Sequence, residues 1–166
     1  DLGVITPEVE DLRDRHNIPG MHVLQFDVCD PGFQLSDVKT NSVCYTGTHD
    51  NDTTIGWFHG SPNDIREATD IALDQEAALR VTGGTAETIH TDLITAAFST
   101  DARIAIAPLQ DYLGLGSEAR LNTPGTPGGN WRWRVLDTQL SPKLCDNIAS
   151  MVKSSKRGLS AHESTN

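Results

Sequence analysis

A short apolar run, Ser42-Val43-Cys44-Tyr45, leads directly into the polar segment Thr46-Gly47-Thr48-His49-Asp50-Asn51-Asp52-Thr53-Thr54. The run has the length and composition of a β-strand, and nearly all the residues after it carry hydrogen-bonding side chains. In parallel α/β proteins, the loops at the carboxyl ends of the strands carry the functional side chains. We therefore expect a strand over 42–46 and a functional loop directly after it.

On either side of this segment, helices and strands alternate. We expect further strands over 21–26 and 103–109, and helices over 6–16, 61–82, 85–98 and 142–153. A turn-rich segment over 27–41 and a long loop over 113–133, with one helical turn at 117–121, connect them. The inward-facing helix positions are expected to be Ile65, Ala68, Ala72, Glu76 and Leu79, then Ile89, Leu93, Ala96 and Ala97. Such alternation predicts a parallel α/β sheet, and three strands cannot close a barrel, so we expect part of a larger α/β fold.

Charge and composition exclude several classes of partner. The 166 residues carry a net charge of −10, which repels phosphate backbones and anionic lipid, so we expect neither nucleic-acid nor membrane binding. No apolar stretch approaches the length of a membrane span. Three widely spaced cysteines, Cys29, Cys44 and Cys145, suit free thiols in a reducing, cytoplasmic compartment. The first residues, 1–5, look like the end of an element that began earlier.

The segment around His49 and Asp50 has three interpretations. His49 can donate to sugar hydroxyls while Asp50 and Asp52 accept from them or stabilise a developing cation. Alternatively, the segment is a tight turn whose Asp and Asn side chains cap a following helix. His and Asp are also metal ligands, although adjacent positions are poorly spaced for one ion.

Two later segments could also contribute to a site. Gly114-x-Gly116 is a weak match to a nucleotide loop, because position 119 is Ala, and rigid-loop glycines are the alternative. In Asn130-Trp131-Arg132-Trp133-Arg134, an extended chain would place both Trp on one face, available for stacking on sugars or for the core. Gln25 and Phe26 end the predicted first strand and share the rim with His49. We interpret the remaining histidines as structural: His16, His22, His59, His90 and His162.

Taken together and in this order, these segments resemble the amylomaltases, the 4-alpha-glucanotransferases also called disproportionating enzymes. The resemblance covers about residues 1–153 and rests on segments 1–7, 19–21, 23–26, 45–53, 113–126 and 130–134. It implies a (β/α)8 TIM barrel, of which residues 1–153 would form the C-terminal portion, about strands 6–8, incomplete on its own. Segment 27–41 departs from the family's Pro- and His-rich pattern.

The resemblance also implies a function and site residues. It implies transfer of α-1,4-glucan segments between maltooligosaccharides by a retaining mechanism, without metal or organic cofactor. Asp50 would be the catalytic Asp that stabilises the transition state, and His49, Asn122 and Phe26 would bind substrate. The family's nucleophile and acid/base Glu correspond to positions before Asp1, so the isolated chain is expected to be inactive and to need the N-terminal part of the barrel.

Other outcomes stay open at this stage. The chain could be an inactive glucan-binding or interaction module, or a small hydrolase-like or metal-dependent enzyme using His49, Asp50 and Asp52. We expect a cytoplasmic protein, or a plastid one in a photosynthetic eukaryote. Residues 154–166 are polar and lack an apolar stripe, which predicts a disordered tail. Uncovered sheet edges should make the isolated chain prone to aggregation.

Overall fold

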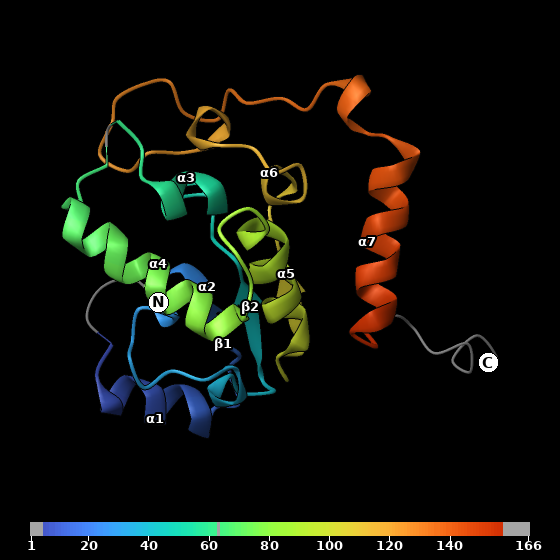
Figure 1. Cartoon of the computed structure of the whole chain (residues 1–166). Coiled ribbons are helices and arrows are strands. Elements are labelled where there is room, and N and C mark those ends of the chain that lie inside the picture. Colours follow the sequence, from blue (N-terminus) through green and yellow to red (C-terminus); the bar gives the residue numbers. More distant parts are fainter. Residues whose placement is uncertain (1–4, 63, 158–166) are drawn as a thin grey trace.

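Three parallel strands form the centre of the molecule. The structure, a computed structural model, describes residues 5–62 and 64–157. Strands β1 (Gly20–Val23), β2 (Ser42–Tyr45) and β3 (Ile104–Ile106) lie in the order β1-β2-β3, and both pairings are parallel (Figure 1). The predicted parallel α/β sheet is therefore confirmed for these strands. Residues 1–4 and 158–166, including His162, lie outside the described part of the chain.

Two strands are shorter than the sequence predicted. Residues Leu24–Asp27 form the one-turn helix α2 instead of extending β1, because Leu24 and Val28, four positions apart, are both fully buried in the core. Gln25 and Phe26 therefore lie on a helical turn, not at a strand end. Strand β3 stops at Ile106, and helix α6 (Leu109–Tyr112) begins directly after Pro108.

Each predicted helix is present in the structure, but several begin or end at other residues than predicted. Helix α1 (Pro7–Arg15) begins after Thr6, and α7 (Pro142–Ser154) begins after Ser141, whose hydroxyl accepts from Leu144 N, as capping residues should. Helix α3 (Thr54–His59) was not predicted as a separate element. The remaining elements are α4 (Ala68–Thr82), α5 (Ile89–Ser99) and the 3₁₀ turns η1 (Leu35–Asp37), η2 (Ser117–Ala119) and η3 (Asp137–Gln139).

The predicted start of the fourth helix is wrong by seven residues. Helix α4 begins at Ala68, and Ile65, expected in its apolar stripe, is 97% exposed. Of the other positions expected to face inward, only Leu79 packs against the core, whereas Ala68, Ala72 and Glu76 are exposed. Arg66 explains the difference, because its guanidinium donates to Asp64, to Asp74 and to the main-chain oxygen of Trp57. These bonds hold the preceding segment in a turn.

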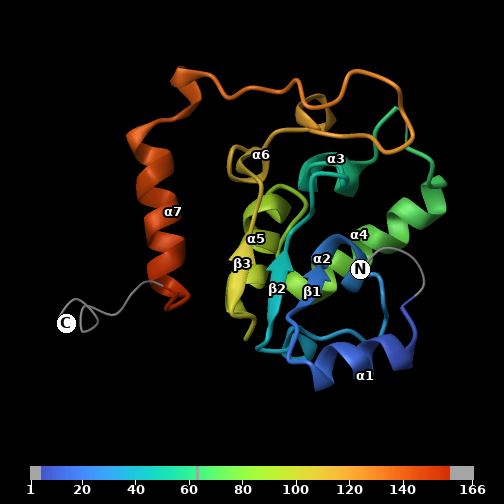
Figure 2. The same cartoon turned by 180° about the vertical axis from the view of Figure 1, so that it is seen from behind.

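One face of the sheet is covered and the other is open. The predicted inward positions of α5, namely Ile89, Leu93, Ala96 and Ala97, are all buried, and α5 packs against α3, α4, α6 and β3. Figure 2 looks onto the opposite face, where no described helix lies over the strands. Met21, Ile104 and Ile106 on this face are 40%, 49% and 42% exposed.

Helix α7 stands apart from the sheet in both views and contacts α5. Ser154, expected to begin a disordered tail, is instead the last residue of α7. Arg157 donates to the main-chain oxygens of Phe98 and Ala102 at 2.7 and 2.8 Å, and also to that of Thr100. These bonds satisfy carbonyls at and beyond the end of α5.

Candidate active site

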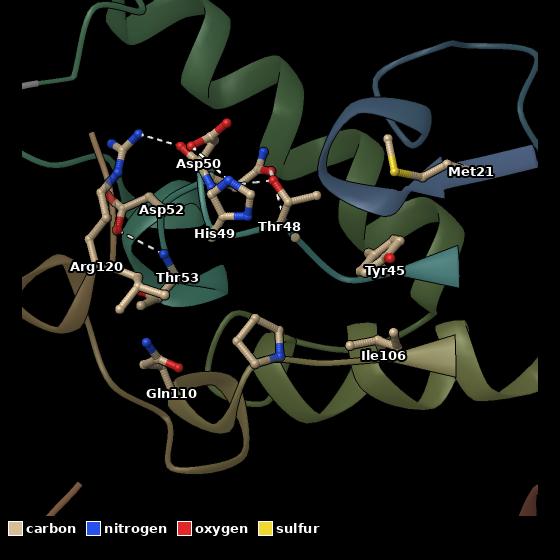
Figure 3. A pocket seen from close by; sticks show the side chains of 14 residues that line it. Met21, Tyr45, Thr48, His49, Asp50, Asp52, Thr53, Ile106, Gln110 and Arg120 are labelled. Atoms are coloured by element: carbon tan, nitrogen blue, oxygen red, sulfur yellow. Dashed lines mark hydrogen bonds and ion pairs between the residues drawn. The ribbon is translucent and has the colours of Figure 1, made fainter. Parts of the chain in front are cut away.

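A cavity of about 440 Å³ lies at the carboxyl ends of the three strands. Its apolar base consists of Met21, Tyr45 and Ile106, one residue from each strand. Its polar wall comes from the loop after β2, from Gln110 on α6 and from Arg120 in the loop after α6 (Figure 3). Side chains from three strands thus converge on one hollow, as expected for this end of a parallel sheet. The polar lining residues are Thr48, His49, Asp50, Asn51, Asp52, Thr53, Gln110 and Arg120.

The loop after β2 is a tight turn followed by a helix. The Asn51 carboxamide oxygen accepts from the main-chain nitrogen and the hydroxyl of Thr48, at 2.9 and 2.8 Å. The Thr53 hydroxyl accepts from Gly56 N and caps α3. The segment is therefore a tight turn, as the capping interpretation expected, but the residue that caps the following helix is Thr53 and not an Asp or Asn. The turn leaves His49 and Asp50 among the residues that line the cavity.

Asp50 carries the exposed carboxylate of the loop. One of its oxygens, Oδ1, accepts a 2.5 Å hydrogen bond from the side-chain amide of Asn122 and lies 3.3 Å from His49 Nε2. The Asp50 and His49 side chains remain 44% and 55% exposed, so both are accessible from the cavity. The structure thus brings together three of the four predicted site residues, although Asn122 itself does not line the cavity.

Phe26 lies apart from this group. It is 65% exposed on α2 and does not line the cavity. Its neighbour Gln25 is buried and donates to the main-chain oxygen of Asp52 at 3.0 Å. Gln25 and Phe26 therefore do not share the cavity rim with His49. Gln25 supports the loop from beneath its backbone, and Phe26 exposes its ring to solvent.

Asp52 is turned toward protein donors. Its Oδ1 accepts from Thr53 N at 2.8 Å, and its Oδ2 accepts from the Ser117 hydroxyl at 2.6 Å. Both oxygens are thus engaged, which disfavours the metal interpretation of His49, Asp50 and Asp52. Within residues 5–62 and 64–157, no cluster of three or more His, Cys, Asp or Glu side chains is arranged to hold a metal ion.

Three supporting residues were not predicted. Arg120 donates to the main-chain oxygens of Asp50 and Asn122 at 2.7 and 2.9 Å. Asp111, 1% exposed, accepts from the Thr46 hydroxyl at 2.7 Å and from Thr54 N at 2.8 Å. The third residue is Ser117, whose hydroxyl donates to Asp52. Asp111 therefore joins the two ends of the His49–Asp50 loop.

Burial raises the pKa of Asp111, because desolvation outweighs the hydrogen bonds from Thr54 and Thr46 that favour its charged form. In the sequence Asp111 stands between Gln110 and Tyr112, which gives no local signal of its supporting role. Its partners are 57 and 65 positions away, so the sequence does not reveal them.

The segment Gly114–Gly116 is a rigid turn. Gly114 has φ +63°, a conformation that favours glycine, and its nitrogen donates to the Asp111 carbonyl. The nitrogens of Leu115 and Gly116 donate to the Gln110 main-chain oxygen and the Glu118 carboxylate. Since these amides have protein acceptors, the rigid-loop interpretation accounts for the glycines.

Trp131 packs beside the site. Its ring centroid is 5.2 Å from that of His49, with the planes tilted by 38°, and it is 52% exposed. Its φ of +62° breaks the extended alternation expected for 130–134, while Trp133 is half-buried. Trp131 thus belongs to neither a shared Trp face nor the core, and its exposed indole lies beside His49.

Fold and site define an α/β protein with a carboxylate-bearing pocket at the carboxyl ends of parallel strands. The chain belongs to the 4-alpha-glucanotransferase family, whose family model matches residues 1–139. This finding confirms the resemblance noted in the sequence. No described helix is long and apolar enough to cross a membrane.

Individual relatives agree with this assignment. The chain is 47% identical over 158 residues to a 4-alpha-glucanotransferase of Synechocystis sp. and 43% identical over 164 residues to one of Thermus thermophilus. These matches cover 92% and 95% of this chain but 30% and 32% of the relatives. Among solved structures, the amylomaltase from Streptococcus agalactiae in complex with acarbose aligns with a TM-score of 0.77 and 26% identity. That alignment covers 95% of this chain and 31% of the other.

Proposed function

We propose that this chain is part of a 4-alpha-glucanotransferase that moves α-1,4-glucan segments between maltooligosaccharides with retention of configuration. In this proposal β1, β2 and β3 are about the sixth to eighth strands of a (β/α)8 barrel formed by residues 1–153 and the N-terminal part of the barrel. The open apolar face of Met21, Ile104 and Ile106 supports it, because strands in such a barrel pack side chains into a filled interior.

The observation that carries the proposal is the placement of Asp50. Its carboxylate faces the cavity, half-exposed, with the Asn122 amide and the His49 imidazole beside it. A retaining transfer passes through an oxocarbenium-like transition state, and a fixed carboxylate near the sugar ring stabilises that charge. We assign this role to Asp50, and sugar-hydroxyl binding to His49 and Asn122. Phe26, an exposed aromatic ring, is assigned to an acceptor subsite.

The bond-breaking pair lies elsewhere in the proposed enzyme. Retention requires a carboxylate nucleophile and an acid/base about 5–5.5 Å apart. Asp52 does not suit either role, because Ser117 and Thr53 occupy its oxygens. The proposed reaction therefore needs carboxylates from another part of the barrel, and we expect the 166-residue chain to have no transferase activity.

The test is Asp50→Asn in the complete gene product, with glucose release from maltotriose as the assay. We expect kcat to fall by about 10²–10³-fold, as for the loss of one preorganised electrostatic group. The melting temperature should stay nearly unchanged, because Asp50 lies on an exposed loop. Asp101→Asn, on an exposed residue distant from the cavity, is the matched control. Unchanged kinetics with a lowered melting temperature would contradict the proposal.

A second candidate function is glucan binding without catalysis. It is favoured by the exposed Trp131 ring beside His49, since aromatic faces stack on sugar rings. Calorimetric titration of the 166-residue chain with maltoheptaose separates the candidates. Heat of binding without glucose release supports a binding module, whereas turnover by the chain alone would refute the proposed division of catalytic residues.

A further inference from the structure

In the described part of the chain, the Arg120 guanidinium binds main-chain oxygens and not carboxylates. Among the described residues it forms no ion pair, whereas Arg66 pairs with Asp64 and Asp74. Its half-buried guanidinium instead donates to two main-chain oxygens, those of Asp50 and Asn122. A planar guanidinium presents its donors in a rigid fork, so two acceptors held by one fork are held relative to each other.

The two acceptors belong to the residues that meet at the site. Asn122 donates from its side chain to the Asp50 carboxylate at 2.5 Å, while Arg120 binds the main chain of both. The three residues therefore close a ring of hydrogen bonds. Within this ring, the position of the Asp50 carboxylate depends on Arg120 through two routes, its own backbone and the Asn122 amide.

We infer that Arg120 is a positioning residue that fixes the Asp50 carboxylate in its orientation toward the cavity. The inference rests on the proposed function of Asp50. A group that stabilises developing charge is effective only when it is held in place beforehand, and displacement by about 1 Å can cost on the order of 10²-fold in rate.

The loops do not depend on Arg120 alone for their attachment. Ser117 binds Asp52 at 2.6 Å, and Asp111 binds Thr46 and Thr54, so both connections survive without the guanidinium. An Arg120 variant is therefore expected to fold. Loss of Arg120 frees the Asp50 carbonyl and the Asn122 carbonyl and loosens only the tip of the loop.

The experiment compares Arg120→Ala, Arg120→Lys and the control Arg103→Ala in the complete gene product with maltotriose as substrate. Arg103 is exposed at the amino end of β3, away from the cavity. For Arg120→Ala we expect kcat to fall roughly 10- to 100-fold with KM changed less than threefold. Arg120→Lys should recover part of kcat, and added guanidinium at millimolar concentration should partly rescue Arg120→Ala. Arg103→Ala should match the wild type.

A cycle with Asn122→Ala tests the route. If Arg120 acts through the ring, Arg120→Ala/Asn122→Ala loses less kcat than the product of the single losses. Multiplicative losses, a fall in melting temperature with no change in kcat, or absence of rescue by both lysine and guanidinium overturn the inference alone. Full activity of Asp50→Asn overturns the proposed function, and the inference with it.

Discussion

The side-chain amide of Asn122 donates a 2.5 Å hydrogen bond to the carboxylate of Asp50, across 72 residues of sequence. The bond uses one oxygen of Asp50 and leaves the other for the cavity. It also brings together the loop after β2 and the loop after α6, which both contribute to the polar wall of the site. The geometry of the proposed catalytic carboxylate therefore depends on a residue from a different loop.

Substitution of Asn122 should reduce catalysis. In Asn122→Ala the Asp50 side chain loses its donor, and we expect kcat to fall by about 10-fold or more because the carboxylate samples other rotamers. In Asn122→Asp, like-charge repulsion should turn the two carboxylates apart and give a larger loss. Steady-state kinetics on maltotriose measure both. Equal kcat for the two variants would argue against an orienting role for the amide.

Asp111 should couple stability to pH. Burial raises its pKa in the folded state, so the unfolded chain loses this proton at lower pH than the folded chain. Its ionisation therefore lowers stability as pH rises through the interval between the two pKa values. Asp111→Asn lacks this titration, so the stability of wild type relative to Asp111→Asn should fall over that interval. Urea unfolding between about pH 4 and pH 8 measures the difference.

Truncation at the same position separates charge from hydrogen bonding. Asp111→Ala leaves the Thr46 hydroxyl and Thr54 N without their acceptor in a buried site, which should cost about 1–3 kcal/mol. Asn can still accept from Thr54 N and bond to Thr46. A variant pair in which Asn and Ala are equally destabilising would show that the carboxylate charge itself is required.

The Trp131 ring should contribute to glucan binding. Because Trp131 has a positive φ, Asn is the suitable replacement, since it tolerates this conformation and removes the ring. We expect Trp131→Asn to raise the KM or Kd for maltoheptaose several-fold, with kcat affected less. Leu136→Ala is the control, an exposed apolar residue in the same segment. Unaltered affinity in Trp131→Asn would leave the ring only a packing role beside His49.

Gly56 marks a close approach between helix α3 and the turn η2. A Cβ at this position would lie 2.3 Å from Ser117 Oγ and 2.6 Å from Asp52 Oδ1. Gly56→Ala should therefore separate Ser117 from Asp52 and destabilise the protein by about 1–3 kcal/mol. Gly128→Ala, where a Cβ meets nothing within 4 Å, should be nearly neutral. Adding Ser117→Ala to Gly56→Ala should restore part of the melting temperature, and no restoration would locate the strain elsewhere.

The spacing of apolar residues along the sequence predicted the elements whose buried positions recur at regular intervals. The four inward positions of α5 follow from their three- and four-residue spacing, and the strand before His49 follows from its apolar composition. Patterns failed where a distant partner decides the conformation. Arg66 donates to Asp74 and to the main-chain oxygen of Trp57, and these bonds hold Ile65 outside the helix. The sequence around Ile65 does not indicate either partner.

The site was predictable to a similar extent. His49 and Asp50 were predicted from the density of polar residues after a strand, and Asn122 from family resemblance. Arg120, Asp111 and Ser117 make their decisive contacts across 57 to 70 residues, so no local spacing indicates them. Residues that support a site through long-range hydrogen bonds require the tertiary structure for their assignment.

The ties between the two loops, from Ser117 to Asp52 and from Arg120 and Asn122 to Asp50, govern how relatives can be recombined. A chimera with its crossover point between α3 and η2 takes each half of this network from a different parent. Unless both parents share the same donors and acceptors, such hybrids lose the hydrogen bonds that orient the Asp50 carboxylate, even when every helix and strand is intact. If residues 46–122 are exchanged as one block, all donors and acceptors of the network come from the same parent.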